Sequence, residues 1–355
     1  MAIDNQQRST IYELSKKAGL SVSTISAVLS GTWSRRGISA RTAEAVKALA
    51  KAHNYMPNRQ AQGLRKSVSQ MTGLMIPSHN SRFFAAVAQS FELNVRRRGK
   101  CPIVVSAGRD PATERETAKT LISYSIEGLV ICGAADPDGV HEICSSAGQR
   151  HVNIDLPGSK VSSVISDNFN GGLTLTSAII ETGNKDGLRA NDIHFFGGCS
   201  EVSTLDRIRG FKVAVDNFAG PPTDEVIHFT GYDPAKTCQA FETYYQNHSR
   251  VPRRIFLNST LNYEGFLRFS SRRPDLDLSD IEIGCCDYDP FASFCIFRTW
   301  MIKQDVVAMM EKAFDILDKD PGDPTIYYIT PILVPPRSSL PTPELAMINV
   351  ETGAI

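Results

Sequence analysis

One short run of the chain, residues 11–30, combines small, apolar and hydroxyl side chains at a regular spacing. Ala18 allows close packing, Gly19 breaks the first helix, and Ile25 and Leu29 give the second helix a buried face. This spacing predicts a helix-turn-helix, whose second helix docks in the major groove of DNA. An ordinary helical hairpin with no nucleic-acid role is the alternative interpretation.

Hydroxyl side chains mark the starts of both helices and continue along the second one. Thr10 and Ser21 are expected to cap the two helices through their side-chain oxygens. In the second helix, the side chains expected to point outward to base edges or phosphates are Val22, Ser23, Thr24, Ser26 and Ala27.

The charge of the chain is divided unevenly. Lys and Arg together number 38, as do Asp and Glu, so the formal net charge is zero. Residues 1–66 nevertheless hold eleven Lys or Arg against three Asp or Glu, and the rest of the chain is acidic. A basic front predicts a polyanion partner for that end alone, because neutralised phosphates release counterions. A merely solvated basic face is the other interpretation.

The elements that would position these groups follow two sequence patterns, one in each part of the chain. A third short helix is expected from Ser39, with Ala43, Val46 and Ala50 on one face. From residue 71, short apolar runs alternate with amphipathic stretches, and closing strands follow at 326–334. That alternation is typical of parallel, doubly wound sheets, and its length fits two similar α/β lobes.

Other classes of protein find little support. Neither an apolar leader after Met1 nor a run of eighteen apolar residues occurs, so we expect a cytoplasmic protein with no membrane partner. The eight cysteines form no C-x-x-C pair, and we expect no metal and no cofactor. The Gly-rich phosphate loops and the G-x-S-x-G nucleophile motif are absent, which predicts a protein that is not an enzyme and has no catalytic residues.

An ordered series of motifs then runs through nearly the whole chain. It includes the helix-turn-helix, His53-Asn-Tyr-Met-Pro-Asn58, Gly73-Leu-Met-Ile-Pro77, Ser166-Asp-Asn168, Arg207 with Gly210-Phe211, and Asp287 with Pro290. Through these motifs the chain resembles the LacI/GalR family of bacterial repressors. The resemblance implies an α/β fold class, with an all-α helix-turn-helix domain and a two-lobed core of doubly wound parallel sheets, similar to periplasmic sugar-binding proteins.

The resemblance also implies a function and a division of the chain. The function is that of a repressor whose affinity for operator DNA is controlled by a sugar or sugar-like effector bound between two lobes. A pure sugar-binding transport component is disfavoured by the helix-turn-helix. The expected partners are double-stranded operator DNA, the effector and a second copy in a homodimer, with a tetramer left open. The expected boundaries are 9–57 for the DNA-binding domain, 58–66 for a hinge helix, about 71–167 and 298–328 for lobe one, and about 168–297 and 329–355 for lobe two.

For DNA binding, the resemblance places Val22, Ser23 and Ala27 in the base-reading set, although Ala27 stands where the family frequently has Arg. The loop 31–37 is longer and more basic than usual, so Arg35 and Arg36 are either phosphate contacts anchored by Trp33 or solvated charges. In the hinge helix, Asn58, Ala61 and Leu64 match the family, with Leu64 as a wedge in the minor groove. A plain linker is the alternative.

For the effector, positions that match the family are His79, Asn80, Phe83, Phe84, Asp155, Arg207, Ser259, Thr260 and Asp287. Arg207 and Asp287 suit bidentate bonds to vicinal hydroxyls, and Phe83 or Phe84 is expected to stack on the apolar face of a ring. Ser259-Thr260 stands where the family commonly has Asn-Asp. The alternative interpretation is that Arg207 and Asp287 simply hold the lobes together. Asp167 and Asn168 are expected to shape a loop and cap a helix.

Overall fold

The computed structural model describes residues 9–56, 69–319 and 322–336. The chain divides into two compact units, Met1–Gln70 and Met71–Ile355. The predicted hinge residues Asn58, Ala61 and Leu64 lie outside the described residues. The last part of the region predicted for lobe two, after residue 336, also lies outside them.

The first unit contains three α-helices among its described residues, α1 (Ile11–Ala18), α2 (Val22–Leu29) and α3 (Ala40–Ala52), with a short 3-10 helix η1 (Ser34–Arg36) before α3. Thr10 and Glu13 form a capping box at α1, and the Ser21 hydroxyl accepts a hydrogen bond from the Thr24 amide at α2. Gly19 ends α1 with a φ of +62°, a left-handed conformation that glycine adopts without strain. These caps and the turn confirm the predicted helix-turn-helix geometry.

A small apolar cluster holds the three helices together. Its buried members include Leu14 of α1, Ile25 of α2 and Val46 of α3. Trp33 packs against the same cluster from the loop 31–37, as predicted, so this loop is anchored to the helices. The exposed arginines Arg35 and Arg36 are therefore carried on a fixed turn.

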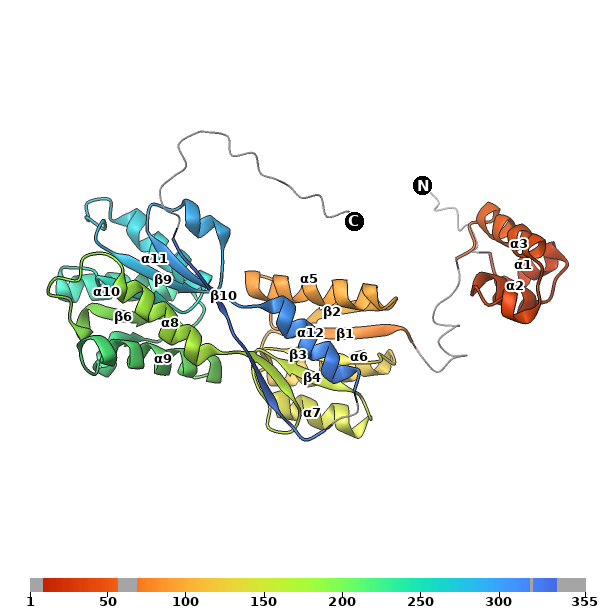
Figure 1. Cartoon of the computed structure of the whole chain (residues 1–355), viewed down its shortest axis with the longest axis horizontal. Coiled ribbons are helices and arrows are strands. Elements are labelled where there is room, and N and C mark those ends of the chain that lie inside the picture. Colours follow the sequence, from red (N-terminus) through yellow and green to blue (C-terminus); the bar gives the residue numbers. More distant parts are fainter. Residues whose placement is uncertain (1–8, 57–68, 320–321, 337–355) are drawn as a thin grey trace. The chain divides into compact units, whose positions relative to one another are not determined.

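The second unit contains two sheets, each with six strands among the described residues. The strand order is β11-β5-β4-β3-β1-β2 in lobe one and β12-β10-β9-β8-β6-β7 in lobe two (Figure 1). All neighbours pair in parallel except β10 and β12. The strands are β1 (Met71–Ile76), β2 (Cys101–Ser106), β3 (Leu129–Cys132), β4 (His151–Ile154), β5 (Ser163–Ser166), β6 (Ile193–Phe196), β7 (Ile227–His228), β8 (Arg254–Leu257), β9 (Glu282–Cys286), β10 (Thr299–Lys303), β11 (Ile326–Ile329) and β12 (Ile332–Val334).

Helices cover both faces of each sheet, which confirms the doubly wound fold. In lobe one, α5 (Arg82–Arg97) and α12 (Val306–Leu317) share one buried cluster, and α6 (Pro111–Ser123) and α7 (Pro137–Ser146) share another. In lobe two, α8 (Asn168–Glu181) and α9 (Val202–Ala219) cover one face, and α10 (Pro234–His248) and α11 (Thr260–Arg272) the other. Short 3-10 helices are η2 (Ala190–Asp192), η3 (Asp224–Val226) and η4 (Pro290–Phe294).

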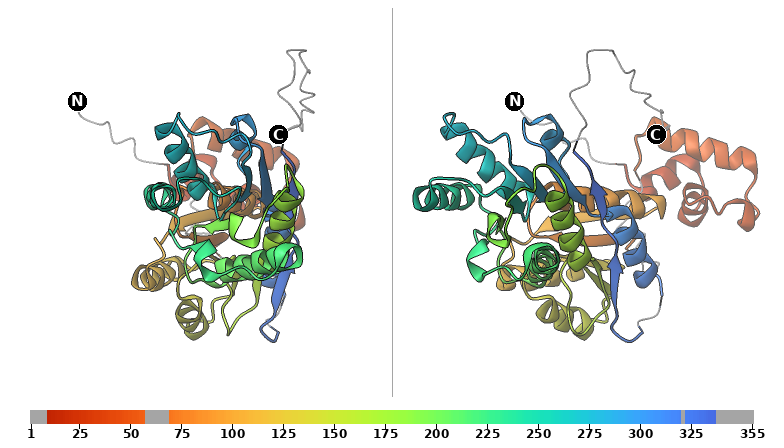
Figure 2. Two further views of the ribbon diagram at one scale, coloured as in Figure 1. Left: turned by 90° about the vertical axis from the view of Figure 1, so that its left-hand side faces the viewer. Right: turned by 60° about the vertical axis from the view of Figure 1, so that its left-hand side comes forward.

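Three described segments connect the lobes, and one of them differs from the predicted boundaries (Figure 2). The first lies between β5 and α8, close to the predicted change at residue 168. The prediction that residues 298–303 belong to lobe one is wrong, because β10 pairs with β9 and β12 in lobe two, and the second crossing falls at Gln304 and Asp305. The third crossing lies between Ile329, which ends β11 in lobe one, and Ile332, which begins β12 in lobe two, close to the boundary predicted at about residue 329.

Helices α8 and α9 touch through two glycines. A Cβ atom added at Gly210 would collide with the carbonyl oxygen of Phe169, and one added at Gly172 would collide with that of Arg207. The two backbones approach as closely as they do because neither position carries a side chain. This contact fixes the position of Arg207 in α9.

A buried arginine lies at the other end of the lobe-two sheet. Arg254 of β8 is 0% exposed, and its Nη2 donates to the carbonyl oxygens of Thr182 and Asn184 at 2.7 and 3.0 Å. Glu282, its register neighbour on β9, is 4% exposed and lies 3.6 Å from Arg298. Arg254 Nε and Glu282 Oε2 have no hydrogen-bond partner. The cation thus holds the loop after α8 and offsets a buried carboxylate.

Two pairs of histidines are hydrogen-bonded inside the lobes. His194 Nε2 lies 3.0 Å from the Asn191 carbonyl, so Nε2 carries the proton and Nδ1 accepts from His228 Nε2 at 2.9 Å. In lobe one, His151 Nδ1 lies 2.9 Å from the Gln149 carbonyl, so its Nε2 accepts from His141 Nδ1 at 3.0 Å. The accepting members, His194 and His151, are therefore held as neutral imidazoles.

We expect the stability of lobe two to fall as the pH decreases from about 6.5 to about 4. Burial, and then the neighbouring His228, lower the pKa of His194 from 6.5 to about 4, and burial lowers that of His228 to about 4 as well. Between these values the unfolded chain binds protons that the folded one does not, which costs on the order of 3 kcal/mol. Urea titrations followed by the fluorescence of Trp300 in β10 measure this loss.

A double variant, His194→Phe with His228→Phe, removes both protonation sites and should flatten this pH dependence. An unfolding midpoint of the unmodified protein that stays constant between pH 7 and pH 4.5 would contradict the assignment of neutral, buried imidazoles.

Candidate functional site

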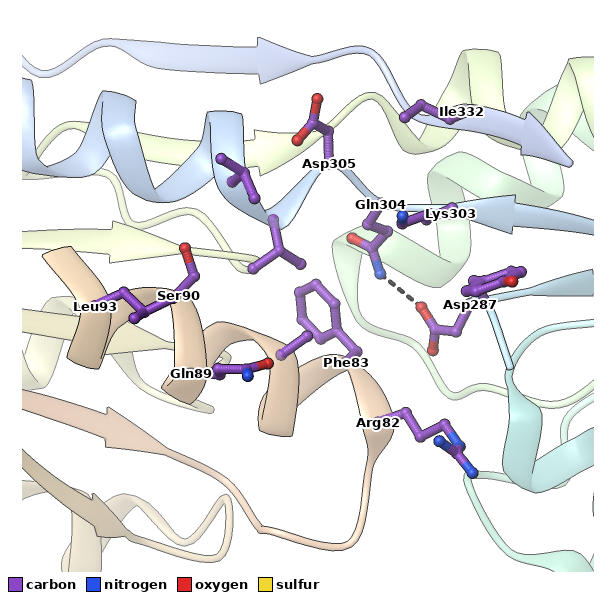
Figure 3. A pocket seen from close by; sticks show the side chains of 14 residues that line it. Arg82, Phe83, Gln89, Ser90, Leu93, Asp287, Lys303, Gln304, Asp305 and Ile332 are labelled. Atoms are coloured by element: carbon purple, nitrogen blue, oxygen red, sulfur yellow. Dashed lines mark hydrogen bonds between the residues drawn. The ribbon is translucent and has the colours of Figure 1, made fainter. Parts of the chain in front are cut away.

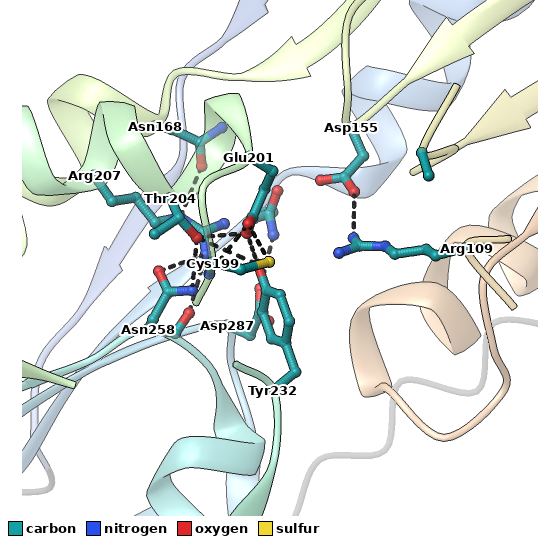
Figure 4. A network of polar contacts seen from close by, with 12 residues as sticks. Arg109, Asp155, Asn168, Cys199, Glu201, Thr204, Arg207, Tyr232, Asn258 and Asp287 are labelled. Carbon is teal, nitrogen blue, oxygen red and sulfur yellow. Dashed lines mark hydrogen bonds and ion pairs between the residues drawn. The ribbon is translucent and has the colours of Figure 1, made fainter. Parts of the chain in front are cut away.

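Polar side chains follow the carboxyl ends of strands in both lobes, and they point toward one another (Figure 4). This is the edge at which open α/β sheets bind ligands. Asp155 and Asp287 follow β4 and β9 directly, with φ values of +75° and +70°. Non-glycine residues in this conformation concentrate at functional sites, and Asp tolerates it better than most. The residues that follow strands are Arg109 (β2), Asp155 (β4), Glu201 (β6), Tyr232 (β7), Asn258 (β8) and Asp287 (β9).

Arg207 lies at the base of this cluster in lobe two and is 5% exposed. Its Nε donates to Asn168 Oδ1 at 2.8 Å, and its Nη1 donates to the carbonyl oxygen and to Oδ1 of Asn258 at 3.0 and 3.2 Å. These contacts fix the plane of the guanidinium and make no use of Nη2. Arg207 is therefore held by neutral amides, as a preorganised donor.

Glu201 accepts hydrogen bonds from three neighbours. The Cys199 thiol donates to Oε2 at 2.6 Å, and the hydroxyls of Thr204 and Tyr232 donate to Oε1. Although burial alone would raise the pKa of Glu201, these bonds outweigh it and lower the pKa below its ordinary value. The carboxylate stays ionised at neutral pH and orients the Tyr232 ring.

Asp155 and Arg109 form the lobe-one side of the cluster. Arg109 Nη2 lies 3.7 Å from Asp155 Oδ2. Burial raises the pKa of Asp155 to about 6, against the opposing effect of Arg109. The Arg109 guanidinium lies 5.8 Å from the ring centroid of Phe84 in its own lobe and 5.3 Å from that of Tyr232 in lobe two. Arg109 thus contacts both lobes.

A cavity of about 290 Å³ lies beside the cluster, between the start of α5 and the second crossing (Figure 3). Gln304 Nε2 donates to Asp287 Oδ1 at 2.7 Å, and Gln304 Oε1 has no partner although the residue is 7% exposed. At the rim, Arg82 Nε of lobe one donates to Asp289 Oδ2 of lobe two at 2.5 Å. This space suits a small polar ligand that contacts both lobes.

The structure brings together three of the residues predicted to bind an effector, Asp155, Arg207 and Asp287. Phe84 lies beside Arg109, and Phe83 lines the cavity, but the two are only 9% and 8% exposed. His79 and Asn80 are exposed in the loop after β1.

Ser259 and Thr260 are not available as a pair of ligand-binding hydroxyls, because the Ser259 hydroxyl is already used within its own helix. The Ser259 hydroxyl is 3% exposed, accepts from the Asn262 amide and donates to Asn262 Oδ1, so it caps α11. Thr260 is the first residue of that helix. Asn258, one residue earlier, contacts Arg207 instead, because it directly follows β8.

The remaining contributors are not predicted from the sequence. Arg109, Glu201, Tyr232 and Asn258 share one signal, a polar side chain shortly after a strand, and that signal identifies them once the sheet is known. Gln304 directly follows β10 and carries the same signal, but the sequence pattern places the start of a helix at residue 302 and so hides the end of the strand. The prediction for Asp167 is confirmed, since its carboxylate caps α8, while Asn168 instead holds Arg207.

In the first unit, α2 presents part of the predicted DNA-reading face. Ser23 is exposed, and Val22, Thr24 and Ser26 are partly exposed. The prediction that Ala27 points outward is wrong, because this residue is 2% exposed. The chain after α2 folds back there, and the Thr32 amide donates to the Ala27 carbonyl at 3.0 Å.

Within the described residues, no group of three or more His, Cys, Asp or Glu side chains has a geometry that would hold a metal ion. In the same part of the chain, no helix combines the length and the apolar character needed to cross a bilayer.

The chain is similar to a series of known regulators. Residues 10–58 match the family described as "Bacterial regulatory proteins, lacI family". The ribitol operon repressor of Klebsiella aerogenes is 40% identical over 189 residues, which are 53% of this chain and 70% of that protein. The sucrose operon repressor of Klebsiella pneumoniae is 24% identical over 315 residues, 88% of this chain and 92% of that one. Among solved structures, the lac repressor dimer bound to operator and the anti-inducer ONPF aligns with a TM-score of 0.78 and 20% identity, covering 92% of this chain and 98% of that chain. This last likeness concerns the fold.

Proposed function

This chain belongs to the lacI family of bacterial regulatory proteins, and we propose that it represses transcription from an operator whose occupancy depends on a small polyhydroxylated effector. The observation that carries the proposal is the polar cluster of Figure 4, to which both lobes contribute, in a chain that also contains a helix-turn-helix. The ribitol and sucrose operon repressors, by their names, support an effector among the sugars and sugar alcohols. Such a repressor acts in the cytoplasm, where the chromosome is.

In this proposal the start of α2 reads base edges through Val22 and Ser23. Thr24, Ser26 and the N-caps Thr10 and Ser21 approach the phosphates. Arg35 and Arg36 add phosphate contacts from the anchored loop. The hinge role of Asn58, Ala61 and Leu64 rests on the family resemblance alone.

We also propose that the protein acts as a homodimer, because operators of helix-turn-helix proteins mirror a two-fold axis. Support comes from lobe two, where Phe291, Phe294 and Ile296 are 68%, 61% and 92% exposed within one short segment. A concentration of large exposed apolar side chains marks an interaction surface. A second copy of the chain, meeting the same segment, would cover it.

The coupling between effector and operator follows from the position of the cluster. A ligand that contacts Asp155 in lobe one and Arg207 in lobe two favours one arrangement of the lobes over others. Its effect on DNA affinity is expected to be about 5- to 150-fold, a coupling free energy of about 1–3 kcal/mol. Inducer and corepressor are both consistent with this geometry.

The test is sequencing of genomic fragments that the purified protein retains, with and without a panel of sugars and sugar alcohols. We expect one palindromic motif, lost or gained with one class of compound. The double variant Val22→Asp with Ser23→Asp should recover no motif, whereas Lys185→Gln, an exposed change in lobe two, should recover it unchanged. Failure of the unmodified protein to enrich any motif would refute the proposal.

A further inference from the structure

Four aromatic rings around the polar cluster and its neighbouring cavity have a cation over one face. Besides Arg109 over Phe84 and Tyr232, Lys303 Nζ lies 5.5 Å from the Tyr288 ring centroid, and the Arg82 guanidinium lies 5.2 Å from that of Phe291. A pyranose ring binds well when its apolar face stacks on an open aromatic ring. Arg109 thus occupies the aromatic faces that the cluster itself offers, those of Phe84 and Tyr232, and Phe83 on the cavity wall is only 8% exposed, which leaves little open aromatic surface there for a ring sugar.

The charges of the cluster are also unsuited to an anionic ligand. Three carboxylates, Asp155, Glu201 and Asp287, face the guanidinium groups of Arg109 and Arg207 (Figure 4). Arg109 is already paired with Asp155, and Arg207 is held by neutral amides through Nε and Nη1. A phosphate or carboxylate on the ligand would thus meet an excess of negative charge in a partly desolvated space.

The hydrogen-bonding groups match a chain of hydroxyls. Each hydroxyl donates one hydrogen bond and accepts others. The acceptors on offer are the carboxylates of Asp155 and Asp287 and the partnerless Oε1 of Gln304, and the donors are the unused Nη2 of Arg207 and the guanidinium of Arg109. Acceptors and donors come from both lobes, so an extended row of hydroxyls satisfies them together.

We propose that the effector is an uncharged, open-chain polyhydroxylated compound, such as an alditol, rather than a ring sugar or a sugar phosphate. The inference rests on the proposed function, because it specifies the ligand of the same site. Arg109 is the selective element: it covers the two aromatic faces and balances Asp155.

Calorimetric titration of the full chain tests this proposal. The probes are the alditols ribitol, xylitol and D-arabinitol, which have no carbonyl group and cannot close into a ring, against methyl α-D-glucopyranoside and ribitol 5-phosphate. We expect at least one open-chain compound to bind at least tenfold more tightly than either the pyranoside or the phosphate ester. Tighter binding of the pyranoside or of the phosphate ester, or no binding of any open-chain compound, overturns the proposal.

Variants separate the contributions to selectivity. Asp287→Asn should weaken binding of the open-chain compound at least tenfold, and Asp224→Asn, an exposed carboxylate in the same lobe, should leave it unchanged. Arg109→Met uncovers the Phe84 and Tyr232 rings, so the preference for open-chain over ring compounds should narrow. An unchanged preference in that variant would show that Arg109 does not determine the selectivity for open-chain compounds.

Operator binding distinguishes failure of the effector proposal from failure of the proposed function. A protein that binds its operator and responds only to a ring sugar or a phosphate ester retains the proposed function and refutes the open-chain effector. A protein that binds an alditol but enriches no operator retains the open-chain ligand and refutes the proposed function.

Discussion

The affinity of the protein for its operator should fall about 10³- to 10⁵-fold when the salt concentration rises from 50 to 200 mM, if a dimer neutralises roughly six to ten phosphates. The expectation follows from the excess of basic residues in the first 66 positions, against an acidic core. Because released counterions drive such binding, the logarithm of affinity should decrease linearly with the logarithm of salt concentration. Fluorescence anisotropy of labelled operator DNA gives the slope directly.

The loop 31–37 supplies the sharpest control for that slope. Trp33 anchors the loop in the helical cluster, so the backbone that carries the exposed Arg35 and Arg36 is held in place. Replacing both by Gln should make the slope shallower by about one unit for each phosphate that is no longer neutralised. Lys185→Gln in lobe two should leave the slope unchanged. A slope near zero for the unmodified protein would reject the electrostatic account of its DNA binding.

Replacing Arg254 by Met should lower the free energy of unfolding by about 3–5 kcal/mol, because the buried Glu282 carboxylate loses a neighbouring cation and the loop after α8 loses its hydrogen bonds to Arg254. The variant keeps a long side chain at this position but leaves the Glu282 carboxylate, 4% exposed, with only Arg298 at 3.6 Å. It also removes the donors to Thr182 and Asn184, which hold the loop after α8. Urea unfolding monitored by Trp300, which donates to the Thr182 hydroxyl, reports the destabilisation where it occurs.

The double variant Arg254→Met with Glu282→Leu distinguishes charge from packing. If the penalty arises from an uncompensated carboxylate, removing that carboxylate should restore most of the stability. If the double variant is as unstable as the single one, the loop contacts of Arg254 are its main role. A decrease below about 1 kcal/mol in the single variant would contradict the inferred burial of charge.

Much of the fold could be predicted because its signals are local. Gly19 between two capped helices and the alternation of apolar and amphipathic runs identify the helix-turn-helix and the doubly wound core. Helix α7 is missed by the sequence pattern although Asp136 and Pro137 form a strong start signal, an N-cap followed by proline. Strand β5 has only four residues, too few for a periodic pattern.

The errors in one lobe boundary and in the site have a different cause. The sequence pattern assigns residues 302 and 303 to a helix, because only three polar residues, Lys303 to Asp305, separate the apolar runs of β10 and α12. Pairing between strands, not composition, decides that they belong to lobe two. Ala27 is a similar case, since its burial depends on a chain reversal at Thr32 that spacing within the helix does not reveal.

In the site, the sequence predicts which types of side chain gather there better than it predicts which neighbouring residue makes each contact. Arg207, Asp155 and Asp287 lie together as predicted, whereas Ser259 stands one residue away from Asn258, the side chain that reaches the cluster. That difference changes the interpretation, because a hydroxyl that caps α11 is unavailable while an amide at the strand end fixes Arg207. Arg109 acts through its position over two rings, and no property of its own sequence segment indicates that.

The crossings between the lobes have a consequence for how this protein is made on the ribosome. Strand β11 completes the lobe-one sheet by pairing Ile326 with Ser163, and β12 completes the lobe-two sheet by pairing with β10. Helix α12, which covers one apolar face of lobe one, also belongs to this last part of the chain. Since synthesis proceeds from the N-terminus, the helix-turn-helix emerges and folds long before either lobe is closed. The nascent protein therefore passes through a period with a finished DNA-binding unit, an uncovered apolar face and no complete effector site.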